Sequence, residues 1–92
     1  MIKEFTIGGI KWAVKSDEAR LDDLKLLGLC EFPKSLISIY EKGIDENLTQ
    51  QTLYHEVVHA ILESMGETEL SANDKFVQNF SLLLHQFETT KK

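Results

Sequence analysis

The sequence predicts one α+β domain, in which a small and mostly antiparallel sheet packs against two helices. Two β-hairpin patterns occupy residues 5–14 and 29–40, and two apolar patterns with helical periodicity cover residues 48–65 and 71–88. The length of 92 residues gives room for a single domain, residues 1–92, with one hydrophobic core.

The first hairpin is predicted around the glycine pair 8–9, because glycine readily takes the positive φ angles of a two-residue turn. The resulting register pairs Ile7 with Ile10 and Phe5 with Trp12. All four apolar side chains then share one face of the hairpin. A second extended pair follows, with alternating side-chain directions in its second half.

The helices are predicted from their end signals as well as their periodicity. Ser16 or Asp17 caps a short helix that stops at Gly28. A long helix over about residues 48–65 stops at the next glycine, and Ser71 begins a last helix that runs to about residue 88.

Charge and cysteine content narrow the partners and the compartment. Fifteen acidic and ten basic residues give a net charge of -5, which disfavours nucleic acid and anionic membranes as partners. The single cysteine, Cys30, has no partner for an internal disulfide, as expected for a chain in the reducing cytosol. No signal peptide or apolar run long enough to span a membrane is found, so we expect a cytoplasmic protein.

The segment that carries chemistry is an HExxH motif within the long predicted helix, formed by His55, Glu56 and His59. Residues four apart lie one turn apart on the same helical face, so both imidazoles can reach one tetrahedral zinc ion. Glu56 is placed to take a proton from a water that zinc activates and to pass it to a leaving amine.

The helical wheel strengthens the metal interpretation. Five polar residues fall within roughly 100° of arc by the 3.6-residue period: Thr52, His55, Glu56, His59 and Glu63. The remaining arc is apolar, so this polar stripe lies on a largely buried helix and needs a binding partner. A zinc ion would satisfy both histidines, and a metal-free structural histidine pair is the alternative.

Catalytic zinc sites usually have three protein ligands, and Asp74 is our first choice for the third. It belongs to a polar stripe on the last helix, one end of which would face the metal: Asp74, Gln78, Ser81 and His85. The alternative is that Asp74 forms a capping box with Ser71. His85 is the rival third ligand, but it lies roughly 16 Å along the helix from Asp74, so the two cannot share an ion. The other candidates are Glu63, Glu67 and Glu69.

The chain, from the first hairpin through the motif and its trailing Ala60 and Ile61, resembles small zincin-like metallopeptidases of phages and bacterial mobile elements. It looks like a minimal relative of the ImmA/IrrE-type group. The resemblance implies a gluzincin-like site, with two histidine ligands, Glu56 as general base and a third acidic ligand that maps to Asp74. Here residues 71–74 read Ser-Ala-Asn-Asp, where the larger relatives carry a glutamate within a Glu-Ala-Asn pattern.

These observations predict a zinc-dependent endopeptidase. By analogy with the larger relatives, the substrate would be a peptide or protein such as a repressor-type regulator, lying extended along the strand that ends near Tyr40. The alternative is a zinc-binding interaction or regulatory module of phage or mobile-element origin without peptidase activity. No residue in the sequence predicts an oligomeric state.

Overall fold

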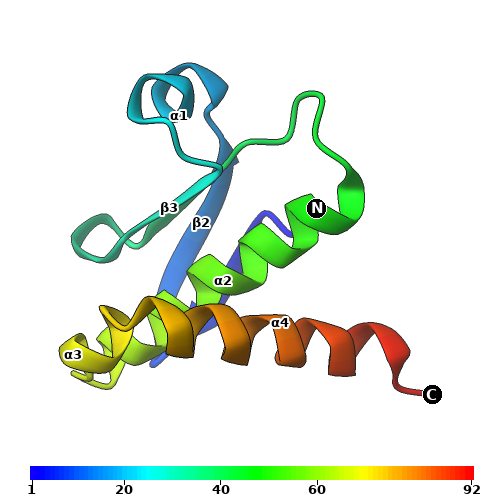
Figure 1. The fold of residues 1–92 in the computed structure, drawn as a ribbon. Helices are drawn as coiled ribbons and strands as arrows, with labels where there is room; N and C mark the ends of the chain where they lie inside the picture. Colours follow the sequence, from blue (N-terminus) through cyan, green and yellow to red (C-terminus); the bar gives the residue numbers. More distant parts are fainter.

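A computed structural model describes all 92 residues (Figure 1). Four strands form one sheet: β1 (Glu4–Ile7), β2 (Ile10–Ser16), β3 (Gly28–Glu31) and β4 (Leu36–Ile39). A 3-10 turn, η1 (Phe32–Lys34), joins β3 to β4. The helices are α1 (Glu18–Leu24), α2 (Glu46–Ser64), α3 (Thr68–Ser71) and α4 (Asp74–Thr90). The predicted α+β class is confirmed.

The sheet has the strand order β1-β2-β4-β3. The glycine turn sets the predicted register between β1 and β2, with Phe5 opposite Trp12 and Ile7 opposite Ile10. Phe5 and Trp12 stack with their ring centroids 5.9 Å apart. β3 and β4 are also antiparallel, as predicted, whereas β2 and β4 run parallel, which makes the sheet mixed.

The strand order corrects the expected position of a bound peptide. β4, the strand that ends next to Tyr40, lies inside the sheet between β2 and β3 and has no free edge. β3 forms the edge on that side. An added strand needs unpaired backbone groups, so only β3 can offer an edge there.

α2 lies between the sheet and α4 and contacts both (Figure 1). Its sheet-facing side completes the main core, whose buried members are Trp12, Val14, Ile37, Ile39, Leu53 and Ala60. Its other side forms a smaller core with α4, made of Val58, Leu62 and Val77. No helix combines the length and the apolar character needed to span a membrane.

Two helix boundaries differ from the prediction: the end of α1 and the start of α2. Asp17 caps α1 as expected, but α1 ends at Leu24, where Lys25 takes the left-handed conformation with φ 57°. Gly28 is therefore not the helix stop and is instead the first residue of β3. α2 begins earlier than expected because the Asp45 side chain accepts hydrogen bonds from its first-turn N–H groups.

The start of the last helix was also predicted wrongly. Ser71 is the final residue of α3, and Asn73 caps α4 by accepting a 3.0 Å hydrogen bond from the N–H of Phe76. The capping box between Ser71 and Asp74 is therefore absent, and Asp74 is the first residue of α4. This change leaves the Ser71 hydroxyl available for a contact elsewhere.

α4 turns its polar stripe toward α2. Ser81 and His85 are buried together with Val77. The large apolar side chains on the other side of α4 are more exposed, including Phe80, Leu83 and Phe87. Gln78, the second residue of the stripe, consequently contacts His55 of the motif.

Candidate functional site

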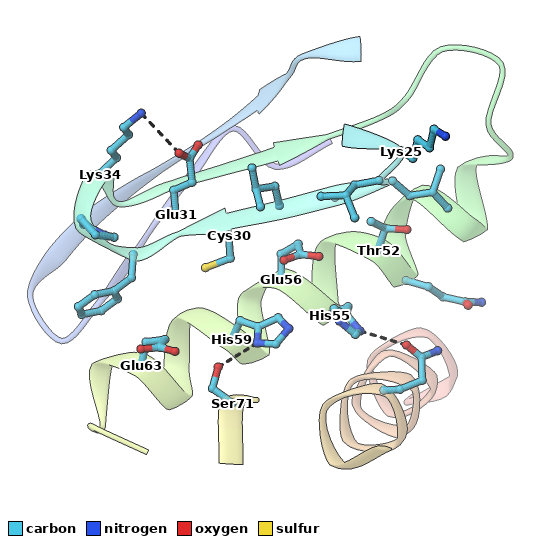
Figure 2. A pocket seen from close by; sticks show the side chains of 18 of the residues that line it. Lys25, Cys30, Glu31, Lys34, Thr52, His55, Glu56, His59, Glu63 and Ser71 are labelled. Atoms are coloured by element: carbon cyan, nitrogen blue, oxygen red, sulfur yellow. Dashed lines mark hydrogen bonds and ion pairs between the residues drawn. The ribbon is translucent and has the colours of Figure 1, made fainter. Parts of the chain in front are cut away.

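A cleft of about 940 Å³ opens between β3 and α2 (Figure 2). One wall is the segment 25–34, which contains β3, and Ser71 and Gln78 contribute from α3 and α4. The opposite wall contains the predicted polar stripe of α2, since the cleft is lined by Thr52, His55, Glu56, His59 and Glu63. The helical wheel therefore placed these five side chains on the correct face.

Both motif histidines are held by hydrogen bonds at Nδ1. His55 Nδ1 lies 3.0 Å from Gln78 Oε1, and His59 Nδ1 lies 2.9 Å from Ser71 Oγ. An amide oxygen only accepts hydrogen bonds, so His55 donates through Nδ1 and keeps the lone pair on Nε2. The Ser71 hydroxyl can accept from His59 in the same way.

The histidine pair has the features of metal ligands. The two rings lie edge to face, with centroids 5.0 Å apart. Histidines that bind zinc through one ring nitrogen commonly donate a hydrogen bond from the other to an oxygen acceptor. The partners of His55 and His59 allow this arrangement. The pair therefore fits two ligand positions of a zinc ion, although no set of three or more His, Cys, Asp or Glu side chains is arranged to hold a metal.

Asp74 is close enough to His59 for its charge to raise the pKa of that imidazole, against the larger lowering by burial and by His55. It lies in the chain between Ser71 and Gln78, the two residues that hydrogen-bond to the histidines. The side chain is exposed and does not line the cleft. Its role as third ligand stays a prediction.

The other candidate ligands differ in whether they line the cleft. Glu63 lines the cleft one turn beyond the second histidine. Glu67 and Glu69 are exposed and do not line the cleft. His85 is buried against Tyr54, with ring centroids 5.1 Å apart, and lines a different and smaller pocket. Of these four, only Glu63 shares the cleft with the histidine pair.

Glu56 lies beneath the sheet edge and is 7% exposed. Burial alone raises the pKa of its carboxyl to about 7. A carboxylate that titrates near neutral pH can both accept and return a proton under physiological conditions. The protonation behaviour of Glu56 therefore suits a general base, the role predicted for it.

Gly28 is a site residue that the sequence analysis missed. A Cβ at this position would lie 2.7 Å from Cγ2 of Thr52 and 3.0 Å from Oε2 of Glu56. Glycine thus permits β3 to pass directly over the polar stripe of α2. Its sequence signal was ambiguous, because glycine also ends helices.

Cys30 also lines the cleft, and its side chain points toward α2 in Figure 2. Burial, followed by the charge of Glu56, raises the pKa of the thiol to about 12. The thiol is therefore protonated near neutral pH and is a poor nucleophile.

Replacing Glu56 by Gln should change how stability depends on pH in the metal-free protein. Because the folded pKa of about 7 lies above the ordinary value of 4.5, wild type should lose stability as pH rises through this interval. Glu56→Gln lacks this loss, so it should gain about 3 kcal/mol over wild type between pH 4 and pH 8.5. Urea unfolding with a chelator present measures the difference, and parallel pH curves would contradict the assigned burial.

Gly28→Ala should destabilise the fold by about 1–3 kcal/mol, because the added methyl group overlaps Thr52 and Glu56. Thr52→Ser removes Cγ2, the nearest of the overlapping atoms. The double variant Gly28→Ala/Thr52→Ser should therefore recover part of the loss in urea unfolding, relative to Thr52→Ser alone. An unchanged stability in Gly28→Ala would show that α2 and β3 are not in this close contact.

Comparison with known proteins does not assign the chain to a family. It matches no family model, no curated protein and no solved structure. The resemblance to zincin-like peptidases accordingly rests on the HExxH motif and its neighbouring residues, and the functional argument rests on the geometry of the cleft.

Proposed function

We propose that this chain is a zinc-dependent endopeptidase whose active site is the cleft between β3 and α2. The observation that carries the proposal is the placement of three groups on one wall: two histidines held at Nδ1 and the buried carboxyl of Glu56 between them in the chain. His55 and His59 would hold zinc through Nε2. Asp74 is the proposed third ligand.

The free edge of β3 suits an extended peptide. The backbone carbonyl of Leu27 accepts a 2.9 Å hydrogen bond from the N–H of Tyr40, so it points toward β4. Backbone groups alternate in direction along an antiparallel strand, so those of Gly28 and Cys30 point away from β4. A peptide could pair with these groups and pass beside Glu56.

Hydrolysis requires a water to lose a proton and the leaving amine to gain one. A bound zinc ion would supply Lewis acidity for this reaction, lowering the pKa of water and polarising the peptide carbonyl. Glu56 would take the proton at its carboxylate and deliver it to the amine nitrogen. Its place beside both histidines on the same wall of the cleft suits it to both transfers.

Gln78 and Ser71 would act as positioning residues. Their oxygens fix the orientation of the two imidazoles and favour a free lone pair on Nε2. Asp74 lies between them, at the point where the chain enters α4. A ligand there would join α4 to the motif through the metal as well as through hydrogen bonds.

Zinc content tests the ligand assignment. After reloading with equimolar zinc, wild type should retain a single ion per chain in elemental analysis, whereas His55→Gln and His59→Gln should lose it. Asp74→Ala should also lose it if that carboxylate is the third ligand. His85→Gln provides the matched control, because His85 lies outside the cleft and its variant should keep zinc.

The contrary outcomes are distinct. Zinc lost in His85→Gln as well would indicate binding elsewhere or unfolding, and absence of zinc from wild type would remove the peptidase proposal. Zinc retained in Asp74→Ala would move the third-ligand role toward Glu63, the other carboxylate near His59.

Glu56→Gln should retain zinc but lose at least about a hundredfold in the rate of peptide hydrolysis, because the amide cannot accept the proton. The rate is measured by mass spectrometry, as the zinc-loaded chain digests a denatured protein mixture. Glu67→Gln, an exposed change outside the cleft, serves as the control and should cleave like wild type. Equal cleavage by Glu56→Gln would exclude this mechanism, and zinc binding without cleavage by wild type would favour the zinc-binding module.

A further inference from the structure

We propose that one end of the cleft is a specificity site for a bulky aliphatic side chain with a carboxylate beside it in the bound peptide. The site consists of Leu26, Leu27 and Leu48, which we call the leucine subsite, together with Lys25. This inference rests on the proposed peptidase function, because it concerns the peptide that the same cleft would bind.

The leucine subsite is an apolar surface left open to solvent. Leu26, Leu27 and Leu48 are 41%, 43% and 40% exposed, and all three line the cleft. They come from two separate segments, the loop after α1 and the first turn of α2. Gly28, which follows Leu27, packs against Thr52, one helical turn after Leu48, so the two segments meet at one end of the cleft. Exposed apolar side chains there lose water when an aliphatic group binds, which favours such a ligand.

The backbone around the subsite is already fixed. The N–H of Leu26 donates a 3.0 Å hydrogen bond to the carbonyl of Leu21, and the carbonyl of Leu27 accepts one from Tyr40. Leu48 is held in the capped first turn of α2, where its N–H donates to Asp45. Little ordering is therefore needed on binding, which preserves affinity.

The subsite lies within reach of the same extended peptide. Leu48 precedes His55 by seven positions on α2, which corresponds to about 10 Å along the helix axis. An extended chain advances about 3.3 Å per residue, so the subsite is about three residues from the proposed reaction centre. One peptide side chain can thus occupy it while the backbone passes Glu56.

Charge polarises the cleft along its length. Lys25 makes no ion pair, whereas the other lysine in the lining, Lys34, lies 3.4 Å from Glu31, which also pairs with Arg20. Figure 2 shows Lys25 at one end of the cleft and the unpaired Glu63 near the other. A peptide carboxylate is attracted to the Lys25 end and repelled from the Glu63 end, so its position selects one binding direction.

The leucine subsite and Lys25 lie at the same end of the cleft. Lys25 directly precedes Leu26 and Leu27 in the chain and lines the same cleft. A peptide that places an aliphatic residue in the leucine subsite can therefore place an adjacent carboxylate near Lys25. A basic residue in that position would meet the like charge of Lys25 instead.

Binding of labelled peptides tests the proposal. The probes are fluorescein-labelled nonapeptides of serine and threonine with a central Leu-Glu pair, and matched versions with Ser-Glu or Leu-Lys. The receptor is the zinc-loaded Glu56→Gln chain, which does not consume the probe, and fluorescence anisotropy reports the Kd. The Leu-Glu peptide should bind about tenfold tighter than Ser-Glu and about fivefold tighter than Leu-Lys.

Further substitutions in this receptor connect the charge preference and the aliphatic preference to the residues proposed for them. Lys25→Glu should reverse the preference between Leu-Glu and Leu-Lys, and Leu48→Gln should reduce the advantage of Leu-Glu over Ser-Glu. Lys15→Glu makes the same charge change on β2, outside the cleft, and should alter neither preference. All three replaced side chains are exposed, so the fold should be retained.

Equal binding of the three peptides, or a charge preference that Lys25→Glu leaves unchanged, overturns the inference. Cleavage of a denatured protein mixture by wild type separates this failure from that of the proposed function. Cleavage at bonds without the aliphatic and acidic pattern would leave the peptidase intact and remove only the specificity site. Absence of both peptide binding and cleavage would overturn both proposals.

Discussion

The packing of α2 against the sheet determines both the hydrophobic core and the chemistry of the cleft. Leu53 and Ala60 pack into the main core, while Gly28 lets β3 approach α2 closely. This approach removes water from Glu56 and so raises the pKa of its carboxyl. The same contact that stabilises the domain thus prepares the proposed general base, because burial acts on apolar and ionisable groups alike.

Burial acts on His59 in the opposite direction. It lowers the pKa of His59, and the neighbouring His55 adds to the effect, so the neutral imidazole is favoured. The neutral form is the one that binds metal. Hydrogen bonds from the two imidazoles to Gln78 and Ser71 orient the rings, which links the site to α4 and α3. The α2 environment therefore favours an uncharged His59 beside a carboxyl that can exchange protons near neutral pH.

Local patterns predicted much of the structure. The glycine pair 8–9 determines the register of the first hairpin, because a two-residue turn allows only one alignment of its strands. The polar stripe of α2 followed from helical periodicity alone. Helix ends were predicted less well: the serine at 71 and the asparagine at 73 are both good caps, and only the geometry of α3 shows that Asn73 caps α4.

The sequence by itself determined the α+β class, the hairpin and the face shared by His55, Glu56 and His59, since these depend on contacts between residues near in the chain. Tertiary structure alone decided that β3 is the sheet edge, that Gly28 lies over Glu56 and that Gln78 and Ser71 contact the histidines. These contacts join segments separated by many residues. They depend on how the elements pack together, which local propensity does not specify.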